Sequence, residues 1–459
     1  MTSVATRFHR LRHLLGIDRA VGFTVLARGW SILSGGLTIL LIAHFLSAAE
    51  QGYYYTFSSL VALQTVFELG FSFVILQLAA HESSQLQIRP NGEITGNEEA
   101  HSRLASILQK SVRWYSVAAL LMAGFLLVAG FHFFSTHGQS SGPVGWRLPW
   151  VCVVLAAVFT FQMDPVFSFL EGCGFVAQVA RLRFTQALTG TLLAWLAFAS
   201  HRGLFAPAAI ILGQAVAGFV FLFSKRHLFV PLLKRKTAVH FVGWRTEIWP
   251  FQWRIALSFF AFYFIFPLFN PVLFAYRGAV EAGRMGMSLT IANSLAALAY
   301  AWINTKASPF GQMVARRDFD GLDRMFFLVV RQSGTLLLGS ESIVVIVLLV
   351  LNAFFPRIAM RMLPIPVFSL LMFTILLNHL VSCEAAYLRA HKREPFLVLA
   401  VVMATMTGTS TLLAGRLWGS TGVTVGYFLC GGVFYLCAGT YIFTKCRRLW
   451  HQEMTSSAV

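Results

Sequence analysis

Charged side chains are scarce in this sequence of 459 residues. Asp, Glu, Lys and Arg together make up 12% of the chain, about half of the roughly 25% that is usual in soluble domains. Hydrophobic residues make up 57%. A surface with so few charges is not built mainly for contact with water, which argues against an ordinary soluble globular protein.

Cysteine is also sparse, and the motifs of common enzyme classes are missing. None of the six cysteines belongs to a CxxC pair and most lie in apolar runs, which favours buried thiols over a metal site or disulfides. The sequence has no Walker or HExxH motif, so neither ATP hydrolysis nor the chemistry of HExxH hydrolases is expected. We expect a protein that is not an enzyme, with no catalytic residues, no cofactor and no resident metal ion.

Long apolar runs are what the sequence has in abundance. They are about 20 residues long, which is the length an α-helix needs to cross roughly 30 Å of hydrocarbon. The first run is too long for the apolar part of a signal peptide and is interpreted as a retained span. The sequence therefore predicts an all-α integral membrane protein with about twelve transmembrane helices, at residues 21–45, 53–78, 114–134, 148–170, 184–200, 205–223, 250–275, 286–304, 332–355, 364–383, 396–415 and 421–444.

The distribution of Lys and Arg tests this assignment through the positive-inside rule. With both termini in the cytoplasm, the cytoplasmic segments carry 26 Lys and Arg and the opposite side carries seven. The excess alternates correctly through every loop. The net charge of +18 is therefore mainly a topology signal, and nucleic acid is not expected as a partner.

Two segments far apart in the chain repeat one pattern. Phe45 to Gly52 and Tyr276 to Gly283 both read aromatic-x-small-Ala-x-Glu-x-Gly. Weaker echoes elsewhere occur in the same order, which predicts two six-helix halves related by a parallel repeat. The predicted halves are residues 1–224 and 250–459, joined by a basic cytoplasmic linker at 225–249. Two such halves are typical of a transporter that works by alternating access.

The segment Leu41 to Tyr55 resembles the start of polysaccharide exporters and O-antigen flippases, within the multidrug/oligosaccharidyl-lipid/polysaccharide superfamily. Leu46 to Tyr53 is similar to the family's Leu-Gly-Pro-x-x-x-Gly-x-Tyr turn between two spans, with Ser-Ala in place of Gly-Pro. Leu170-Glu171-Gly172 resembles the Leu-Gln-Gly that commonly ends the fourth span. The resemblance covers the whole chain in length, span number and repeat.

The resemblance implies export of a polyprenyl-diphosphate-linked oligosaccharide, such as an O-antigen repeat unit of lipopolysaccharide or an exopolysaccharide repeat unit. The substrate would move from the cytoplasmic to the outer leaflet of a bacterial inner membrane. Its long apolar tail, anionic diphosphate and polar glycan require a wide, partly cationic cavity with a lateral opening. The expected partners are this glycan lipid, membrane lipids, and a polysaccharide polymerase or other assembly proteins.

Three arginines within or at the edges of spans are candidates for binding the substrate's diphosphate. Arg28 lies roughly 10 Å inside the first span, and its guanidinium suits bidentate contact with phosphate oxygens. Snorkelling to the lipid headgroups is the structural alternative. Arg254 lies one turn inside the seventh span beside Trp249 and Trp253, where an interfacial anchor is the alternative. Arg331 lies at the mouth of the ninth span.

Three acidic residues within spans are candidates for gating or ion coupling: Glu68, Asp164 and Glu341. An ionisable group at mid-bilayer costs roughly 2.5–3.5 kcal/mol, so each should face protein or water. Glu68 is close in depth to Arg28, so a buried ion pair that opens with substrate or a proton is one alternative. Asp164 precedes Pro165, which removes a helix hydrogen bond and favours a kink.

Other polar groups near the spans have simpler interpretations. Glu171 and Glu384 lie at the cytoplasmic ends of spans and are interpreted as interfacial residues. His44 and His379 are interpreted as hydrogen-bonded structural residues.

Two other functions fit parts of the sequence. A multidrug or small-solute exporter of the same architecture would take cationic drugs and would need acids as the dominant charges of its cavity. A polytopic glycosyltransferase or polymerase would need large loops outside the membrane with an acidic site, whereas the longest internal loop, residues 79–113, lies on the predicted cytoplasmic side.

Overall fold

The computed structural model describes residues 19–88, 93–138, 143–235, 242–391 and 393–456, and nearly all of them are helical. The chain divides into two compact units. The first unit comprises Met1–Leu46, Leu60–Phe134 and Gly145–Phe259, and the second comprises Ser47–Ser59, Ser135–Val144 and Phe260–Val459. Each unit is described on its own below.

The first unit is a helical bundle with one small hairpin. Strands β1 (Leu86–Ile88) and β2 (Ile94–Gly96) pair antiparallel, with Gln87 opposite Thr95. A π-helical turn, η3, covers Trp244–Ile248 and leads into α10. The helices are α2 (Arg19–Phe45), α4 (Gln64–Glu68), α5 (Phe71–Ser83), α6 (Glu98–His137), α7 (Arg147–Gly172), α8 (Val176–Ala199), η2 (Gly203–Phe205), α9 (Ala206–Lys234) and α10 (Trp249–Tyr263), whose last residues pass into the second unit.

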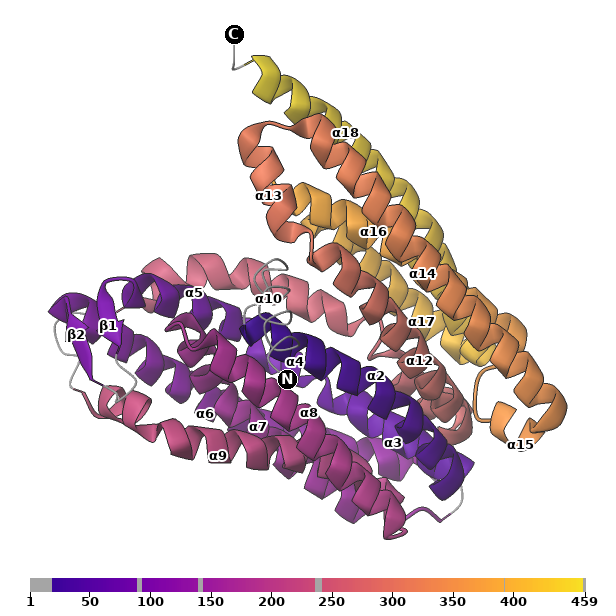
Figure 1. The fold of residues 1–459 in the computed structure, drawn as a ribbon. Helices are drawn as coiled ribbons and strands as arrows, with labels where there is room; N and C mark the ends of the chain where they lie inside the picture. Colours follow the sequence, from indigo (N-terminus) through magenta and orange to yellow (C-terminus); the bar gives the residue numbers. More distant parts are fainter. Residues whose placement is uncertain (1–18, 89–92, 139–142, 236–241, 392, 457–459) are drawn as a thin grey trace, which may run out of the picture. The chain divides into compact units, whose positions relative to one another are not determined.

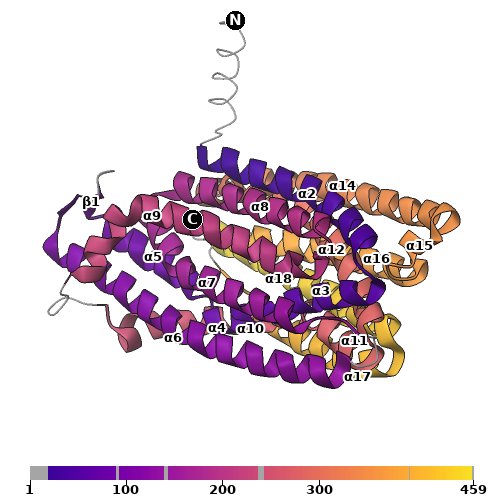
Figure 2. The ribbon, with the colours of Figure 1, turned by 90° about the horizontal axis from the view of Figure 1, so that it is seen from below.

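Helix α8 is central to the packing of the first unit. It lies beside α2 and α9 (Figure 2), while α7 packs on α5 and α9. A small core of Met163, Phe167, Leu182 and Ala217 joins α7, α8 and α9. These contacts hold α7, which carries Asp164, against its neighbours.

The second unit is a second bundle. Helices α14, α16 and α18 run side by side (Figure 1), around a core that includes Phe326, Tyr387 and Phe443. Its elements are α3 (Ala48–Val61), α11 (Phe269–Arg277), α12 (Ala279–Asn304), α13 (Ala307–Arg316), α14 (Phe319–Phe354), α15 (Pro356–Ala359), α16 (Ile365–Arg389), α17 (Leu397–Tyr427), the π-helical η4 (Phe428–Phe434) and α18 (Tyr435–Ser456).

The two segments with the repeated sequence pattern pack on each other inside the second unit. A Cβ built at Gly52 of α3 would lie 1.9 Å from the Ala279 carbonyl oxygen, and one at Gly283 would lie 2.9 Å from the Gly52 nitrogen. Only glycine permits helix backbones to approach this closely. Beside them, the Gln51 amide donates to the carbonyl oxygens of Gly283 and Arg361, each at 2.9 Å.

The exterior of the helices is apolar, as a bilayer requires. Leu33, Leu120 and Val128 have exposed fractions of 75%, 74% and 73%. Within the described residues, eight helices are long and apolar enough to cross a membrane, or nine if the bent pair Ala48–Glu68 and Phe71–Ser83 is one span. The protein is therefore a multi-pass membrane protein of the all-α class, which confirms that prediction.

The eight or nine helices account for the twelve predicted spans in a simple way. The region Leu397–Gln452 holds two predicted spans without a loop between them, because the chain bends at Gly419 (φ 62°) inside α17. The predicted seventh span is divided between α10 and α11, each shorter than a full span. Helix α8, which corresponds to the predicted fifth span, is not among the eight because Arg181 and Arg183 in its first half make it less apolar.

Several helices extend beyond the predicted spans. Helix α6 begins at Glu98, because the polar segment before the predicted span at 114–134 continues the helix instead of forming a loop. Helix α9 continues through Lys234 into the predicted linker. The loop predicted near residues 415–421 is replaced by the bend at Gly419. The division into halves at 1–224 and 250–459 stays a prediction.

Candidate functional site

The second predicted span breaks directly after Glu68. Helix α4 ends at Glu68, Leu69 and Gly70 both have left-handed backbones (φ 54° and 66°), and α5 begins at Phe71. A left-handed conformation costs a residue with a side chain about 1–2 kcal/mol, which Gly70 does not incur. The helices on either side of the break differ in direction by 43°. The break thus places a carboxyl group at the end of a helix within the span.

Two hydroxyl groups donate hydrogen bonds to Glu68. Ser72, one turn further along at the start of α5, donates to its Oε1. Tyr115 of α6 donates to the same oxygen from 3.5 Å. Tyr115 is fully buried, and its ring lies between Phe71 and Phe161, with ring centroids at 6.2 and 4.8 Å. The Glu68 carboxyl group is therefore held in place by two hydroxyl groups within the first unit.

Asp164 of α7 lies close to Glu68 and Tyr115. The Asp164 carboxyl interacts electrostatically with that of Glu68 and with the Tyr115 hydroxyl. Arg183 of α8 is the basic group that acts on it. No hydrogen bond to the Asp164 side chain is found from the described residues. Asp164 and Glu68 thus form a pair of acidic groups in which only Glu68 has dedicated donors.

The helix around Asp164 is continuous. Pro165 lies inside α7, which runs from Arg147 to Gly172 without interruption. Since proline has no N–H, the carbonyl of Phe161 lacks its usual helical donor. Helix α7 therefore continues through Asp164 and Pro165 without interruption, and the predicted kink there stays a prediction.

A second polar contact joins α6 and α7 next to this acidic pair. The Gln162 amide of α7 donates to the Ser116 hydroxyl of α6 at 2.9 Å. Ser116 follows Tyr115 directly, and Gln162 lies two residues before Asp164. We call Glu68, Ser72, Tyr115 and Asp164 the carboxyl cluster; this polar contact continues it along the interface of α6 and α7.

The carboxyl cluster brings together two acidic groups with unequal surroundings. The Ser72 and Tyr115 hydroxyls donate hydrogen bonds to Glu68, whereas Asp164 receives none from the described residues. In a medium of low polarity, two neighbouring carboxylates are costly to ionise together.

The Arg28–Glu68 ion pair, one of the alternatives that the sequence leaves open, is not formed. Arg28 lies on α2 with an exposed side chain, and within the described part of the chain no carboxylate lies at ion-pair distance from it. Glu68 is satisfied by Ser72 and Tyr115 instead. The Arg28 guanidinium is therefore available to an external anion.

The other two candidate arginines lie in different units. Arg254 is in α10 within the first unit, and its side chain lies outside the part of the chain that the structure describes. Arg331 is in α14 within the second unit and is exposed. Their proposed contact with one substrate remains a prediction.

Glu341 is the most isolated of the predicted acidic residues. It lies on α14 with an exposed fraction of 4%, and no group in the described chain bonds to its Oε1. A carboxylate buried without partners costs several kcal/mol, whereas its protonated form costs far less. The position therefore suits a neutral carboxylic acid or a carboxylate that meets a cation in another state of the protein.

Sequence reasoning missed a second buried acid in the same unit. Glu384 of α16, interpreted as interfacial, has an exposed fraction of 8%. Its Oε1 accepts a hydrogen bond from Thr440 of α18 at 2.8 Å, while its Oε2 has no partner among the described residues. Its position near the end of a predicted span concealed this burial, because α16 continues past Glu384 to Arg389 and packs on α18 there.

The minor polar residues behave largely as interpreted. Glu171 forms an ion pair with Arg183 at 3.0 Å with partly exposed side chains. His379 is buried and bonds to the Ser333 hydroxyl at 2.9 Å. Tyr115 was missed; a lone tyrosine at the start of an apolar run was the signal available for it.

No family model matches the sequence, and no characterised protein matches it at the sequence level. Solved structures do resemble the chain over nearly its whole length. An inward-facing MATE family multidrug resistance transporter of the MOP superfamily has a TM-score of 0.61 and 15% identity, covering 92% of this chain and 99% of that chain.

Two further structures match to a similar degree. The MATE multidrug transporter DinF-BH has a TM-score of 0.57 and 13% identity, covering 94% of this chain and 95% of that chain. The lipid II flippase MurJ has a TM-score of 0.57 and 12% identity, covering 95% of this chain and 93% of that chain. At these identities the likeness establishes a shared fold.

Proposed function

We propose that this protein is a flippase of the bacterial inner membrane that exports a polyprenyl-diphosphate-linked oligosaccharide by alternating access. The observation that carries the proposal is the fold, which covers nearly the whole chain and is shared with a lipid II flippase. The turn at Leu46 to Tyr53 and the Leu170-Glu171-Gly172 segment, which resemble those of polysaccharide exporters, support this substrate class. In this proposal both termini lie in the cytoplasm.

Arg28 engages the diphosphate in this proposal. Its side chain is exposed and carries no ion pair in the described chain, and a guanidinium can bind two phosphate oxygens at once. Arg254 and Arg331 supply further positive charge as the substrate passes. Because the long tail stays in lipid, the protein needs to bind only the diphosphate and the glycan.

The carboxyl cluster couples export to a proton or another cation. Asp164 holds the ion, while Glu68 keeps the hydrogen bonds from Ser72 and Tyr115. Protonation removes the repulsion between the two acids, so it changes the energy of the contact between α7 and the break at Leu69–Gly70. Glu341 is the corresponding candidate in the second unit.

A deletion strain of the native host tests the function directly. Polyprenyl-linked glycans and surface polysaccharide are quantified together in the deletion strain and in strains complemented with the wild-type chain or Arg28→Ala. We expect lipid-linked repeat units to accumulate and surface polymer to disappear in the deletion strain and with Arg28→Ala. Unchanged glycolipids and surface polymer in the deletion strain would refute the flippase function.

The Arg28 substitution has two controls. Immunoblotting of membranes establishes that Arg28→Ala is inserted at wild-type level, so that a loss of export is not a loss of protein. Arg28→Lys separates charge from geometry: partial export indicates that charge suffices, and none indicates that bidentate contact is required. Normal export by a well-expressed Arg28→Ala would remove Arg28 from the binding site.

A multidrug exporter of the same architecture is the second candidate. The observation in its favour is the number of buried acids without full partners, since Glu341 and Glu384 suit a cationic drug better than an anionic lipid. The multidrug transporters named above share the fold to the same degree as the flippase. If the deletion strain keeps its surface polymer but becomes sensitive to cationic dyes, this second function replaces the first.

A further inference from the structure

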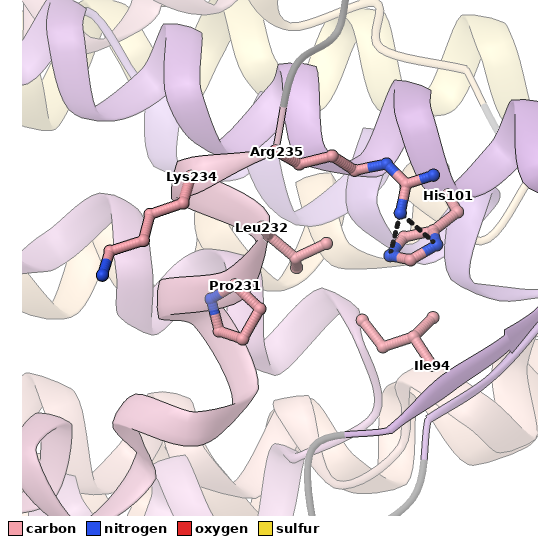
Figure 3. Close-up of a pocket in the computed structure, with 6 residues that line it drawn as sticks. All are labelled: Ile94, His101, Pro231, Leu232, Lys234 and Arg235. Atoms are coloured by element: carbon pink, nitrogen blue, oxygen red, sulfur yellow. Dashed lines mark hydrogen bonds between the residues drawn. The ribbon is translucent and has the colours of Figure 1, made fainter.

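The extension of α6 before the predicted third span and the end of α9 border an open cavity of about 290 Å³ within the first unit. Figure 3 shows its lining: Ile94 of β2 forms an apolar wall with residues of α9, and His101 of α6 faces Arg235. The lining residues are Ile94, His101, Pro231, Leu232, Lys234 and Arg235. The cavity thus has an apolar part and a basic part.

The basic part holds one paired and one unpaired cation. One terminal nitrogen of the Arg235 guanidinium lies 3.0 Å from His101 Nδ1, and the other bonds to the Glu98 carboxylate. Lys234 is exposed, and no contact to its ammonium is found from the described residues. In Figure 3 the ammonium extends away from the His101 ring, on a flexible stem that can turn toward a ligand.

Carbonyl groups at the C-terminus of α9, beside the cavity, accept hydrogen bonds from α6. Helix C-termini carry unpaired carbonyl groups and partial negative charge. Here the Gln109 amide of α6 donates to the carbonyl oxygens of Leu232 and Arg235, each at 2.8 Å. These hydrogen bonds satisfy the carbonyl oxygens of Leu232 and Arg235, so these two acceptors do not offset the charges of the Lys234 and Arg235 side chains.

His101 supports the same conclusion about charge. Burial and the neighbouring Arg235 guanidinium lower the pKa of His101, against the opposing effect of Glu98. An anion that binds Arg235 and displaces it from the ring would offset this effect and favour the protonated imidazole. A bound anion and His101 protonation would therefore strengthen each other.

We propose that this cavity binds the phosphate group of an anionic amphiphile or metabolite at the cytoplasmic face. The Arg235 guanidinium exchanges Glu98 for two phosphate oxygens, Lys234 adds the second positive charge, and Ile94, Pro231 and Leu232 cover the apolar part. This site is separate from the carboxyl cluster and from Arg28, and it does not depend on which substrate the protein exports.

The occupant would also act on the segment that leads into α10. Around the cavity, residues after α9 are attached to α6: the Ser106 hydroxyl accepts a hydrogen bond from the Val242 N–H at 3.0 Å. The Arg103 guanidinium contacts Glu247 at 2.5 Å and Glu82 at 2.9 Å. The Arg235–Glu98 contact is a further attachment to α6, and a phosphate that draws Arg235 from Glu98 would release it.

The experiment uses the full-length protein in nanodiscs and two probes. The first probe is inorganic phosphate, titrated while the ring signals of His101 are followed by NMR. The second is phosphatidylglycerol, whose retention is measured by native mass spectrometry against phosphatidylcholine. Binding of inorganic phosphate identifies a soluble source, and retention of phosphatidylglycerol without inorganic phosphate binding identifies a lipid headgroup.

Matched variants separate the cavity from the general basic surface. Lys234→Gln/Arg235→Gln should weaken binding about tenfold or more, given about 1 kcal/mol for each basic residue near an anionic surface. Lys225→Gln/Arg226→Gln removes the same charge from α9 outside the cavity and should leave binding within about twofold. Glu98→Gln should strengthen binding because it removes the carboxylate that competes for Arg235.

The single variant Lys234→Gln controls for misfolding of the double variant, because it keeps every contact of Arg235. It should still weaken binding severalfold. The proposal is overturned if neither probe binds the wild-type protein. It is equally overturned if both double variants lose binding to the same extent, since that would indicate a diffuse surface effect.

Discussion

At the scale of single residues, the carboxyl cluster combines groups with unequal surroundings. Glu68 accepts hydrogen bonds from two hydroxyls, whereas Asp164 accepts none from the described chain. In the proposed function, Asp164 is the acid that exchanges protons and Glu68 is the acid held by the hydroxyls, so each side chain would serve a different function.

We expect Asp164→Asn to reduce transport more than tenfold and to abolish its dependence on an imposed pH gradient, because an amide cannot carry the proton. Transport is measured in proteoliposomes with the pH inside and outside set independently. Glu171→Gln, which alters an acid at the end of the same helix, should retain coupled transport. Coupled transport by Asp164→Asn would place the exchanging group elsewhere.

Tyr115→Phe removes one of the two donors to Glu68 without changing the packing of the ring. We expect a moderate loss, about three- to tenfold in transport rate, corresponding to about 1 kcal/mol for one hydrogen bond. The measurement is the initial rate in the same proteoliposomes. Rates equal to the wild type would mean that the 3.5 Å contact contributes nothing to the cluster.

At the scale of elements, the close approach of α3 and α12 depends on glycine. A Cβ at Gly52 would meet the backbone of Ala279, which cannot move aside as a side chain can. We expect Gly52→Ala to lower the apparent melting temperature of the purified protein, at a cost of about 1–3 kcal/mol. Gly35→Ala in α2, where a Cβ has open space, is the control and should be neutral or stabilising.

The attachment of the segment before α10 depends on pH. Burial alone would raise the pKa of Glu247, but hydrogen bonds from Arg103 and the Gly243 N–H outweigh it, and its pKa lies below the ordinary value. A lowered carboxyl pKa adds stability above the unfolded-state value, about 4.3, and that stability is lost as the pH falls through the folded-state value.

Hydrogen–deuterium exchange of residues 242–249 measures this attachment. We expect protection in the wild type at neutral pH and its loss below about pH 4. Residues 242–249 of Glu247→Gln should be poorly protected both at neutral pH and below about pH 4. The control Asp320→Asn in α14 should show the protection of the wild type at each pH. Equal protection of Glu247→Gln and wild type at neutral pH would show that the Arg103 contact does not hold the segment.

At the scale of the whole molecule, the proposed orientation assigns each loop to one side of the membrane. In a variant without native cysteines, Arg357→Cys between α14 and α16 should react with an impermeant maleimide added outside intact cells. Arg317→Cys between α13 and α14 should react only after permeabilisation. Both positions are exposed. The opposite result would invert the topology, and labelling of both from one side would remove the span between them.

The sequence by itself determined the fold class, because the length and composition of apolar runs are local properties that lipid forces into helices. It also singled out Glu68, Asp164 and Glu341, since a charge inside an apolar run is visible without coordinates. Tertiary structure decided which of these groups meet. The rotation of each helix places Tyr115 beside Glu68, buries Glu384 against α18 and leaves Arg28 without Glu68, and helix rotation depends on packing between distant segments.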